Sequence, residues 1–188
     1  MINSKNDSLQ VLSVLLHYPD DDLLDRLDEI VSIVAHLSPV EIKSAIQAYI
    51  NELKTHSLIH AQERYTAVFD MNPALTMNMT YHAYGDNEKR AAALAHLQHN
   101  YEKAGWQRIT GELPDYLPLM LEFLSICPDP KHSAPVWQCL AGMQPLVDRL
   151  EKKESIYAAL MQPIVNMAVK HCPSIGTVIV STKQKSNL

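Results

Sequence analysis

The sequence contains very little glycine, with five glycines in 188 residues. Tight β-hairpin turns depend on glycine for their positive backbone torsions, so this scarcity argues against a fold built from short hairpins. Apolar residues instead recur every three or four positions, which is the period of an amphipathic helix. We predict an all-α, single-domain bundle of about seven to nine helices over residues 1–171, with a poorly ordered C-terminal tail over 172–188.

Cysteine and long apolar runs are scarce as well. The three cysteines, Cys127, Cys139 and Cys172, are widely spaced and form no CxxC pair, which indicates neither a disulfide framework nor a zinc site. Apolar runs are far shorter than the roughly 20 residues that a membrane helix requires. The N-terminus also lacks the charged start and long apolar stretch of a secretory signal. These absences predict a soluble, cytoplasmic protein that does not insert into a membrane.

Positive charge is in the minority. Lys and Arg total 16 and Asp and Glu total 21, so the net charge is 16 − 21 = −5. A general nucleic-acid binder needs a basic face, so this class of protein is disfavoured. A basic peptide is a better electrostatic partner, although a net charge of this size is also usual for a soluble protein.

Several helix boundaries follow from single residues. Ser38, followed by a proline and by Glu41, forms a capping-box pattern that predicts the start of a helix. Residues 73–87 have weak periodicity, so we expect an irregular connection that is closed by Gly85, with Asp86 as the candidate cap of the next helix.

Two prolines fall inside the last predicted helices. These helices span about 134–151 and 155–171, and they contain Pro145 and Pro163. Proline lacks an N–H group and clashes with the preceding turn, so we expect each helix to be kinked or split.

Residues 112–124, ELPDYLPLMLEFL, are typical of a buried helix yet carry Asp115 and Glu122. If Asp115 caps this helix, Pro118 falls at the third helical position, where it costs no hydrogen bond. Glu122 shares a predicted face with Leu119. It is either solvated or placed to bind an arginine of a partner, and the two interpretations are evenly balanced.

Catalytic signatures are missing from the sequence: it has no GxSxG, no P-loop, no GxGxxG and no protease-type cysteine motif. A hydrolase using Asp115 and Glu122 remains as an alternative. These residues are seven positions apart, which is about 10 Å along a helix and wide for a concerted acid and base. We therefore predict that the protein is not an enzyme and has no catalytic residues and no cofactor.

The nine histidines raise the question of a metal site. His56 and His60 are one helical turn apart, as are His96 and His99, and this spacing can place two imidazoles on one ion. We identify no third ligand near either pair and no HExxH sequence. The prediction is that these histidines are structural or solvated and that there is no metal site.

The segment 112–124 resembles the hallmark of the nitrate reductase delta-subunit family, the NarJ-type chaperones for molybdenum cofactor assembly. The resemblance continues in AQERYTAVFD (61–70), in YHAYGDNEKR (81–90), in the LxHYPDDxL of the first helices and in HLQHNYEKAGWQ. It covers roughly residues 9–165. One departure is Glu88, which stands where the family commonly has a basic residue.

This resemblance implies an all-helical, system-specific chaperone that is not part of the finished enzyme. Its partner would be the apo catalytic (alpha) subunit of a respiratory nitrate reductase, bound in the cytoplasm chiefly through its N-terminal peptide. The chaperone would hold this subunit for insertion of the molybdenum cofactor before membrane attachment. A transient contact with cofactor delivery proteins is also implied. The alternative is a generic helical adaptor for a basic amphipathic peptide.

The resemblance also gives candidate client-binding residues. One wall of the expected groove carries acidic and apolar side chains of the hallmark segment, a second wall comes from ERYTAVFD, and two further residues position the connecting loop. For Tyr65 and Phe69, plain core packing is the favoured interpretation. In this order the candidates are Asp115, Tyr116, Pro118, Leu119 and Glu122; Tyr65, Phe69 and Asp70; and His82 and Arg90.

Overall fold

Helices are the only extended regular elements in the part of the chain that the structure, a computed structural model, describes: residues 4–38, 40–107, 109 and 111–172. One isolated antiparallel bridge joins Asn78 to Tyr116. The predicted all-α class is therefore confirmed. The expected tail over 172–188 falls, apart from Cys172, outside the described residues.

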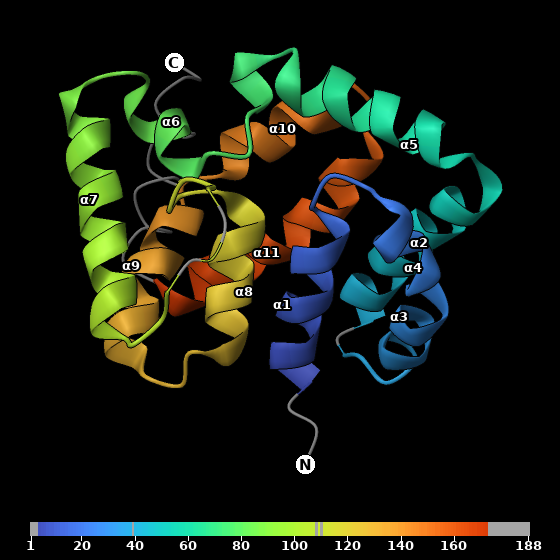
Figure 1. The fold of residues 1–188 in the computed structure, drawn as a ribbon, viewed down its shortest axis with the longest axis horizontal. Coiled ribbons are helices and arrows are strands. Elements are labelled where there is room, and N and C mark those ends of the chain that lie inside the picture. The colour runs from blue at the N-terminus through green and yellow to red at the C-terminus, as the bar shows by residue number, and fades with distance from the viewer. Residues whose placement is uncertain (1–3, 39, 108, 110, 173–188) are drawn as a thin grey trace, which may run out of the picture.

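The described residues form eleven α-helices and two short helical turns (Figure 1). In chain order they are α1 (Ser4–Leu15), α2 (Asp21–Asp25), α3 (Leu27–Val34), α4 (Val40–Thr55), α5 (Leu58–Tyr65), the π-helical turn η1 (Thr66–Asp70), the 3-10 turn η2 (Pro73–Leu75), α6 (Met79–Tyr84), α7 (Glu88–Lys103), α8 (Leu117–Ile126), α9 (Pro130–Leu140), α10 (Gln144–Lys152) and α11 (Ile156–His171).

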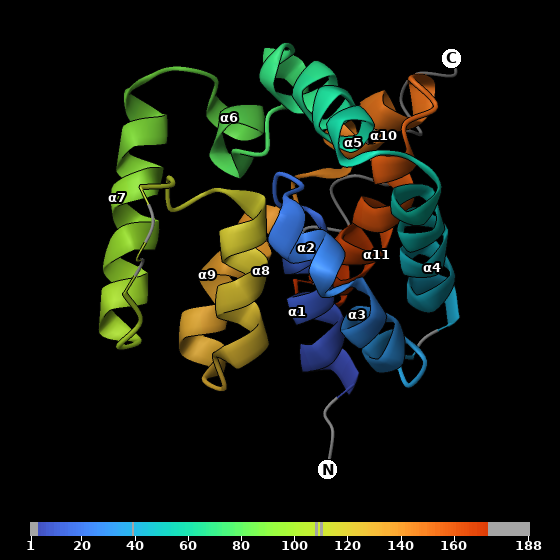
Figure 2. The ribbon, with the colours of Figure 1, turned by 45° about the vertical axis from the view of Figure 1, so that its right-hand side comes forward.

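The centre of the fold is the contact between α1 and α8. Leu12 and Leu15 of α1 are fully buried, as are Met120 and Leu121 of α8. The Ser13 hydroxyl donates to the carbonyl oxygen of Pro118 at 2.8 Å, so the two helices are also joined by a hydrogen bond. Figures 1 and 2 show α7 at one end of the molecule and α3 and α4 at the other, with α1 and α8 between them.

The segment 21–34 is divided at Arg26 into α2 and α3. Asp20 caps α2, because its side chain accepts from the backbone N–H of Leu23 at 2.9 Å. The next predicted start, at Ser38, involves Pro39, which lies outside the described residues; α4 begins at Val40. This division is one reason why the helices outnumber the prediction.

Prolines act differently at the two predicted positions. Pro145 lies in the first turn of α10, after a break that separates α9 from α10, so the predicted helix over 134–151 is split. Proline is tolerated there because the first-turn N–H groups have no partner within the helix. Pro163 does not split its helix, since α11 continues through it.

The predicted irregular connection over 73–87 instead contains η2 and α6. Gly85 ends α6 with a φ of 64° and a ψ of −153°, a conformation that is open to glycine and strained for other residues. The predicted cap at Asp86 is wrong. Asn87 caps α7 by accepting from the backbone N–H groups of Lys89 and Arg90.

Among the described helices, none has the length and hydropathy required to span a membrane.

Candidate functional site

The start of α8 is joined to the start of α6 by two backbone hydrogen bonds. The N–H of Met79 donates to the carbonyl of Asp115, and the N–H of Leu117 donates to the carbonyl of Met77, each at 2.9 Å. Two segments almost 40 residues apart in sequence are thereby held in register. This pairing fixes where the side chains of the hallmark segment lie.

Asp115 is completely buried, with 0% of its surface exposed. Its Oδ2 atom accepts from the backbone N–H of Thr80 at 3.0 Å and from the Thr80 hydroxyl. Thr80 lies in the first turn of α6, where backbone N–H groups lack partners within the helix. Asp115 therefore caps α6, a helix that precedes it in the sequence.

The prediction that Asp115 caps its own helix is wrong. The residue at that position of α8 is Tyr116, and its side chain makes no capping hydrogen bond. The sequence pattern suggested a local cap because Asp115 precedes the helix by two residues. It gave no indication that Thr80, 35 residues away, would compete for the carboxylate.

Arg90 of α7 provides the positive charge near Asp115. Its Nη2 atom lies 3.9 Å from the Asp115 Oδ2 atom, and its guanidinium carbon lies 5.6 Å from the centre of the Tyr81 ring. The Arg90 Nε and Asp115 Oδ1 atoms are buried without a hydrogen-bond partner among the described residues. The ion pair offsets part of the cost of burying a carboxylate and connects α7 to the α6–α8 junction.

His82 holds the other side of α6. Its Nε2 atom lies 2.8 Å from the carbonyl oxygen of Thr76, so this nitrogen carries the proton and donates. Burial lowers the pKa of His82, which keeps the ring neutral. His82 thus lies within the connecting segment, in α6, and Arg90 lies just after it, in α7.

A pocket of about 280 Å³ opens beside this junction, between η1, the segment 76–78 and the hallmark segment. Four of the predicted client-binding residues line it: Tyr65, Phe69, Asp70 and Tyr116. Glu112 and Tyr18 also line it. ERYTAVFD and the hallmark segment both line this hollow, although Tyr116 is the one candidate of the hallmark segment among its lining residues. Client binding there stays a prediction.

Three of the residues that line this pocket are tyrosines. The hydroxyls of Tyr65 and Tyr116 lie 3.1 Å apart, and the Tyr65 hydroxyl also donates to the carbonyl of Leu16 at 3.3 Å. The ring of Tyr18 meets that of Tyr65 edge-on, with ring centres 5.5 Å apart. Burial raises the pKa of both Tyr65 and Tyr116, so both phenols are protonated near neutral pH.

The pocket is acidic. Asp70 and Glu112 are exposed at its rim, and the described residues that line it include no lysine, arginine or histidine. His17 lies next to it, with its ring centre 5.5 Å from that of Tyr116. Burial lowers the pKa of His17, although the nearby carboxylates, Glu122 first among them, oppose this shift. A neutral His17 adds no positive charge to this face.

The remaining predicted residues are not together in this pocket. Pro118 and Leu119 are buried in α8, where Leu119 has 5% of its surface exposed. Glu122 is exposed on the same helix. Asp115 and Glu122 thus do not share an open groove, because Asp115 is enclosed. The buried position of Asp115 gives it no surface to offer a client in this conformation.

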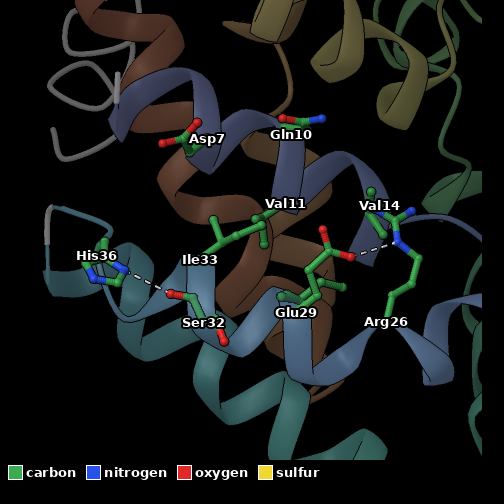
Figure 3. A pocket seen from close by; sticks show the side chains of 10 residues that line it. Asp7, Gln10, Val11, Val14, Arg26, Glu29, Ser32, Ile33 and His36 are labelled. Atoms are coloured by element: carbon green, nitrogen blue, oxygen red, sulfur yellow. Dashed lines mark hydrogen bonds and ion pairs between the residues drawn. The ribbon is translucent and has the colours of Figure 1, made fainter. Parts of the chain in front are cut away.

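A second pocket, of about 510 Å³, lies between α1 and α3 (Figure 3). Arg26 and Glu29 point toward each other at its edge, with 3.5 Å between Nε and Oε2, and the His36 ring lies 3.0 Å from the carbonyl oxygen of Ser32. It contains none of the predicted site residues. Size alone therefore does not make it the functional site.

The sequence profile of the nitrate reductase delta subunit matches residues 38–152. The chain belongs to the nitrate reductase delta-subunit family. This matched range contains η1, α6, α7 and the hallmark segment, and so every predicted site residue of the acidic pocket and of the Asp115 cluster. The family resemblance predicted from the sequence is confirmed.

Relatives of this delta-subunit family member are named as chaperones. It is 30% identical to a NarJ-type nitrate reductase molybdenum cofactor assembly chaperone of Bacillus subtilis, over 84% of this chain and 86% of the relative. It is 32% identical to NarJ of Escherichia coli, over 85% and 69% respectively. Identity to NarW of Escherichia coli is 28%, over 85% and 67%. These relatives agree with the prediction that the chain is not an enzyme.

The fold is shared with a solved structure. A crystal structure of a protein from Archaeoglobus fulgidus, named as a redox enzyme maturation protein, superposes with a TM-score of 0.63. It covers 86% of this chain and 92% of the other, at 21% sequence identity. At this identity the likeness concerns the helical architecture.

Sequence reasoning missed several residues of the pocket in this delta-subunit family member. Glu112 and Tyr18 line it, and Thr80 anchors the carboxylate behind it. Glu112 is the first residue of the hallmark segment, and Tyr18 lies in the LxHYPDDxL sequence. Both could have been found by asking which polar members of the shared motifs lack a role in the core.

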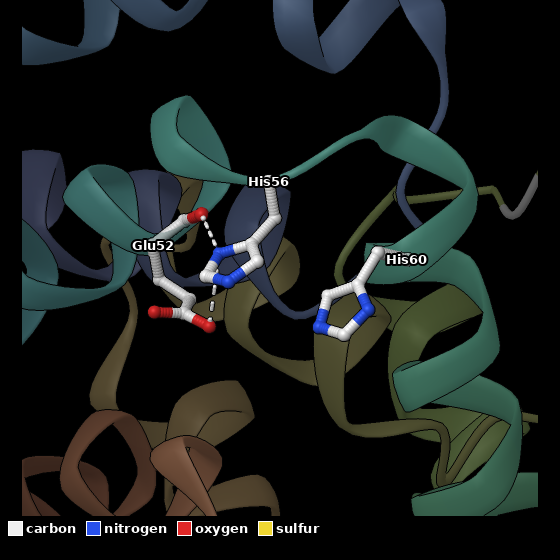
Figure 4. A group of neighbouring side chains, drawn as sticks. All are labelled: Glu52, His56 and His60. Carbon is white, nitrogen blue, oxygen red and sulfur yellow. Dashed lines mark hydrogen bonds and ion pairs between the residues drawn. The ribbon is translucent and has the colours of Figure 1, made fainter.

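A different group of side chains corrects the expectation that no third ligand lies near the histidine pair at 56 and 60. Ligand atoms of Glu52, His56 and His60 all lie within 4.8 Å of one another (Figure 4). Glu52 precedes His56 by four residues, the same spacing that drew attention to the histidines. This spacing was the signal that sequence reasoning overlooked.

Proposed function

We propose that this protein is a system-specific chaperone for the assembly of a respiratory nitrate reductase. It binds the apo catalytic subunit in the cytoplasm and holds it for insertion of the molybdenum cofactor before the enzyme attaches to the membrane. Transient contact with cofactor delivery proteins belongs to the same proposal. The names of its relatives in Bacillus subtilis and Escherichia coli support this assembly role.

The observation that carries the proposal is the acidic, tyrosine-lined pocket. Its rim carboxylates, Asp70 and Glu112, suit a basic side chain of a client, because a guanidinium can donate two parallel hydrogen bonds to a carboxylate. Tyr65, Phe69 and Tyr116 provide aromatic surface of the kind enriched in protein interfaces. An N-terminal segment of the catalytic subunit that is basic and amphipathic would match both features.

The buried cluster behind the pocket has a positioning role in this proposal. Asp115 holds the start of α6 through Thr80, and the adjacent backbone pairing holds Met77 and Asn78 at the pocket wall. A preformed wall reduces the ordering cost of binding. Asp115 and Arg90 would then affect client affinity without touching the client.

The test is calorimetric titration of the full chain with a peptide from the N-terminus of the cognate catalytic subunit. Binding near micromolar Kd, about −8 kcal/mol, is expected. Asp70→Asn combined with Glu112→Gln should weaken it by roughly tenfold or more, since charge-assisted hydrogen bonds are lost. Glu41→Gln is the matched control, because Glu41 is exposed on α4 and does not line the pocket.

Two outcomes would count against the proposal. Absence of heat with the wild-type chain would show that the peptide is not a client. Equal weakening of binding by the control Glu41→Gln would show that the pocket is not the binding site. Equal affinity for an unrelated peptide of the same charge and amphipathic pattern would favour the generic adaptor. Peptide affinity should also be measured for two further variants. Glu122→Gln tests whether the client contacts the surface of α8, and Asp115→Asn tests whether the buried cluster positions the pocket.

A further inference from the structure

We propose that Glu52, His56 and His60 form a binding site for one divalent transition-metal ion, with Zn²⁺ as the reference ion. The three residues come from the last part of α4, from the turn that follows it and from α5 (Figure 4). Their ligand atoms all lie within 4.8 Å of one another. Two imidazoles and one carboxylate are the ligand set of many open zinc sites. The proposal is independent of the client-binding function.

The geometry requires only a small closure. Zinc bonds of roughly 2.0–2.2 Å in a tetrahedral site bring ligand atoms to roughly 3.3–3.6 Å from one another. The side chains therefore need to approach by about an ångström. They can do so because the His56 and Glu52 side chains are 42% and 28% exposed and are not confined by the core.

His56 is already oriented by its other nitrogen. Its Nδ1 atom lies 3.1 Å from the backbone carbonyl oxygen of Glu52, so Nδ1 carries the proton in the neutral ring. The Nε2 atom then presents its lone pair. Donation from the second ring nitrogen to a carbonyl is the usual support of a metal-binding histidine.

Arg64 occupies the position of a cation in this cluster. It donates to the Glu52 carboxylate, and its Nη2 atom also lies 2.8 Å from the Nε2 atom of His60. Arginine can only donate, so the His60 Nε2 atom is the acceptor and its proton is on Nδ1. The guanidinium thus keeps His60 in the form that binds metal. An incoming ion would displace it from both ligands.

This arrangement makes a specific and unusual prediction about Arg64. Removal of a surface arginine generally weakens a charged cluster, whereas here it removes a competitor for the same ligands. Metal affinity should therefore rise when Arg64 is replaced by an uncharged residue. Replacing Arg64 would also raise the affinity if Zn²⁺ were attracted only by the charge of surface carboxylates. The histidine variants must therefore be measured together with the Arg64 variant.

The chain provides a matched control in its other histidine pair. His96 and His99 are exposed on α7 and have the helical spacing, and the Glu102 Oε2 atom lies 4.0 Å from the His99 Nδ1 atom. These side chains do not converge: among the described residues, only Glu52, His56 and His60 have three ligand atoms within 4.8 Å of one another. If binding is adventitious, substitution of either histidine pair should lower the metal affinity to a similar extent. If the site is specific, of the histidine substitutions only those at His56 or His60 should lower it.

The experiment is titration of the metal-free full chain with ZnCl₂ alone, followed by calorimetry and, separately, by thermal unfolding. We expect one ion per chain, a raised unfolding temperature, and at least a tenfold loss of affinity in His60→Gln and in Glu52→Gln. Arg64→Met should bind several-fold more tightly than the wild type. His96→Gln combined with His99→Gln should leave affinity unchanged.

The contrary results are equally definite. Equal loss in the α7 control, or no loss in His60→Gln, would identify adventitious surface binding and overturn the site. Weaker binding in Arg64→Met would overturn the competitor role; if that variant does not fold, Arg64→Gln gives the same comparison. Circular dichroism of each metal-free variant distinguishes loss of the site from loss of the fold.

Discussion

The carboxylate of Asp115 accepts hydrogen bonds from both the backbone N–H and the hydroxyl of Thr80, and so caps a helix that begins 36 residues before it. This contact joins the hallmark segment to α6 through a completely buried side chain. Arg90 lies near the same carboxylate oxygen, with 3.9 Å between Nη2 and Oδ2. The three residues act as one unit, so changes to any one of them should be felt at the others.

Asp115→Ala should lower the free energy of unfolding by about 3 kcal/mol, because it removes the cap of α6 and takes from the half-buried Arg90 its buried carboxylate partner, leaving only the exposed Asp86. Asp115→Asn keeps an acceptor for Thr80 and should cost about 1–2 kcal/mol. Urea unfolding of both variants at neutral pH checks this order. A loss below about 0.5 kcal/mol in Asp115→Ala would show that the cluster is dispensable for stability.

Gly85→Ala should lower the free energy of unfolding by about 1–3 kcal/mol, since a φ of 64° with a ψ of −153° is strained for any residue with a Cβ atom. Space is not the reason, because nothing lies within 4 Å of an added Cβ atom. Gly142→Ala is the matched control: its backbone torsions are not of this kind, and its nearest contact is 3.5 Å. Similar losses at both positions would contradict the argument from backbone strain.

The hydroxyls of Tyr65 and Tyr116 should be energetically coupled. Tyr65→Phe removes the hydrogen bonds to Tyr116 and to the Leu16 carbonyl, and should cost about 1 kcal/mol of stability. Tyr116→Phe alone should cost less, because the Tyr65 hydroxyl keeps its bond to Leu16. In a double-mutant cycle the coupling should be about 0.5–1 kcal/mol, and strict additivity would show that the two phenols do not interact.

His82 should make stability depend on pH. Burial lowers its folded-state pKa below the ordinary value of 6.5, so the unfolded chain takes up a proton first as the pH falls. The stabilisation that the neutral His82 side chain contributes to the folded state is therefore complete above pH 6.5 and is lost progressively below that value. His17 should act in the same direction, since burial lowers its pKa as well.

The check is urea unfolding of the wild type and of His82→Gln at about pH 7.5 and about pH 5.5. Glutamine retains a donor for the Thr76 carbonyl but does not titrate, so the loss of stability between the two pH values should be smaller in the variant. His36→Gln is the control, because His36 is exposed. An identical pH dependence in the wild type and His82→Gln would assign the effect to other groups.

Local chemistry in the sequence was enough to predict the helical class and several elements. The periodic apolar residues of α1, α4 and α7 lie in single uninterrupted helices, since their patterns need no distant partner. The proline at 145 marked a helix start for a reason that is local to the backbone. The motif resemblance also led to four residues that line one pocket.

The failures share a physical cause. The cap formed by Asp115 and the short helix α6 depend on contacts between segments that are far apart in sequence. A five- or six-residue helix has too few periods for its pattern to be seen, and its stability comes from such contacts. Glu52 is the exception, since its four-residue spacing to His56 is local, but a lone glutamate at such spacing is common on helices and does not by itself indicate a ligand.

The acidic pocket is assembled from four stretches of chain, at Tyr18, at 65–70, at 76–78 and at 112–116. During synthesis the pocket cannot form until residues 112–116 have left the ribosome and α8 has packed against α1. A chain that has not folded therefore cannot capture a partner through this pocket. A partner in this pocket binds the folded chain but not the unfolded chain, so its binding would also raise the free energy of unfolding of the whole helical domain.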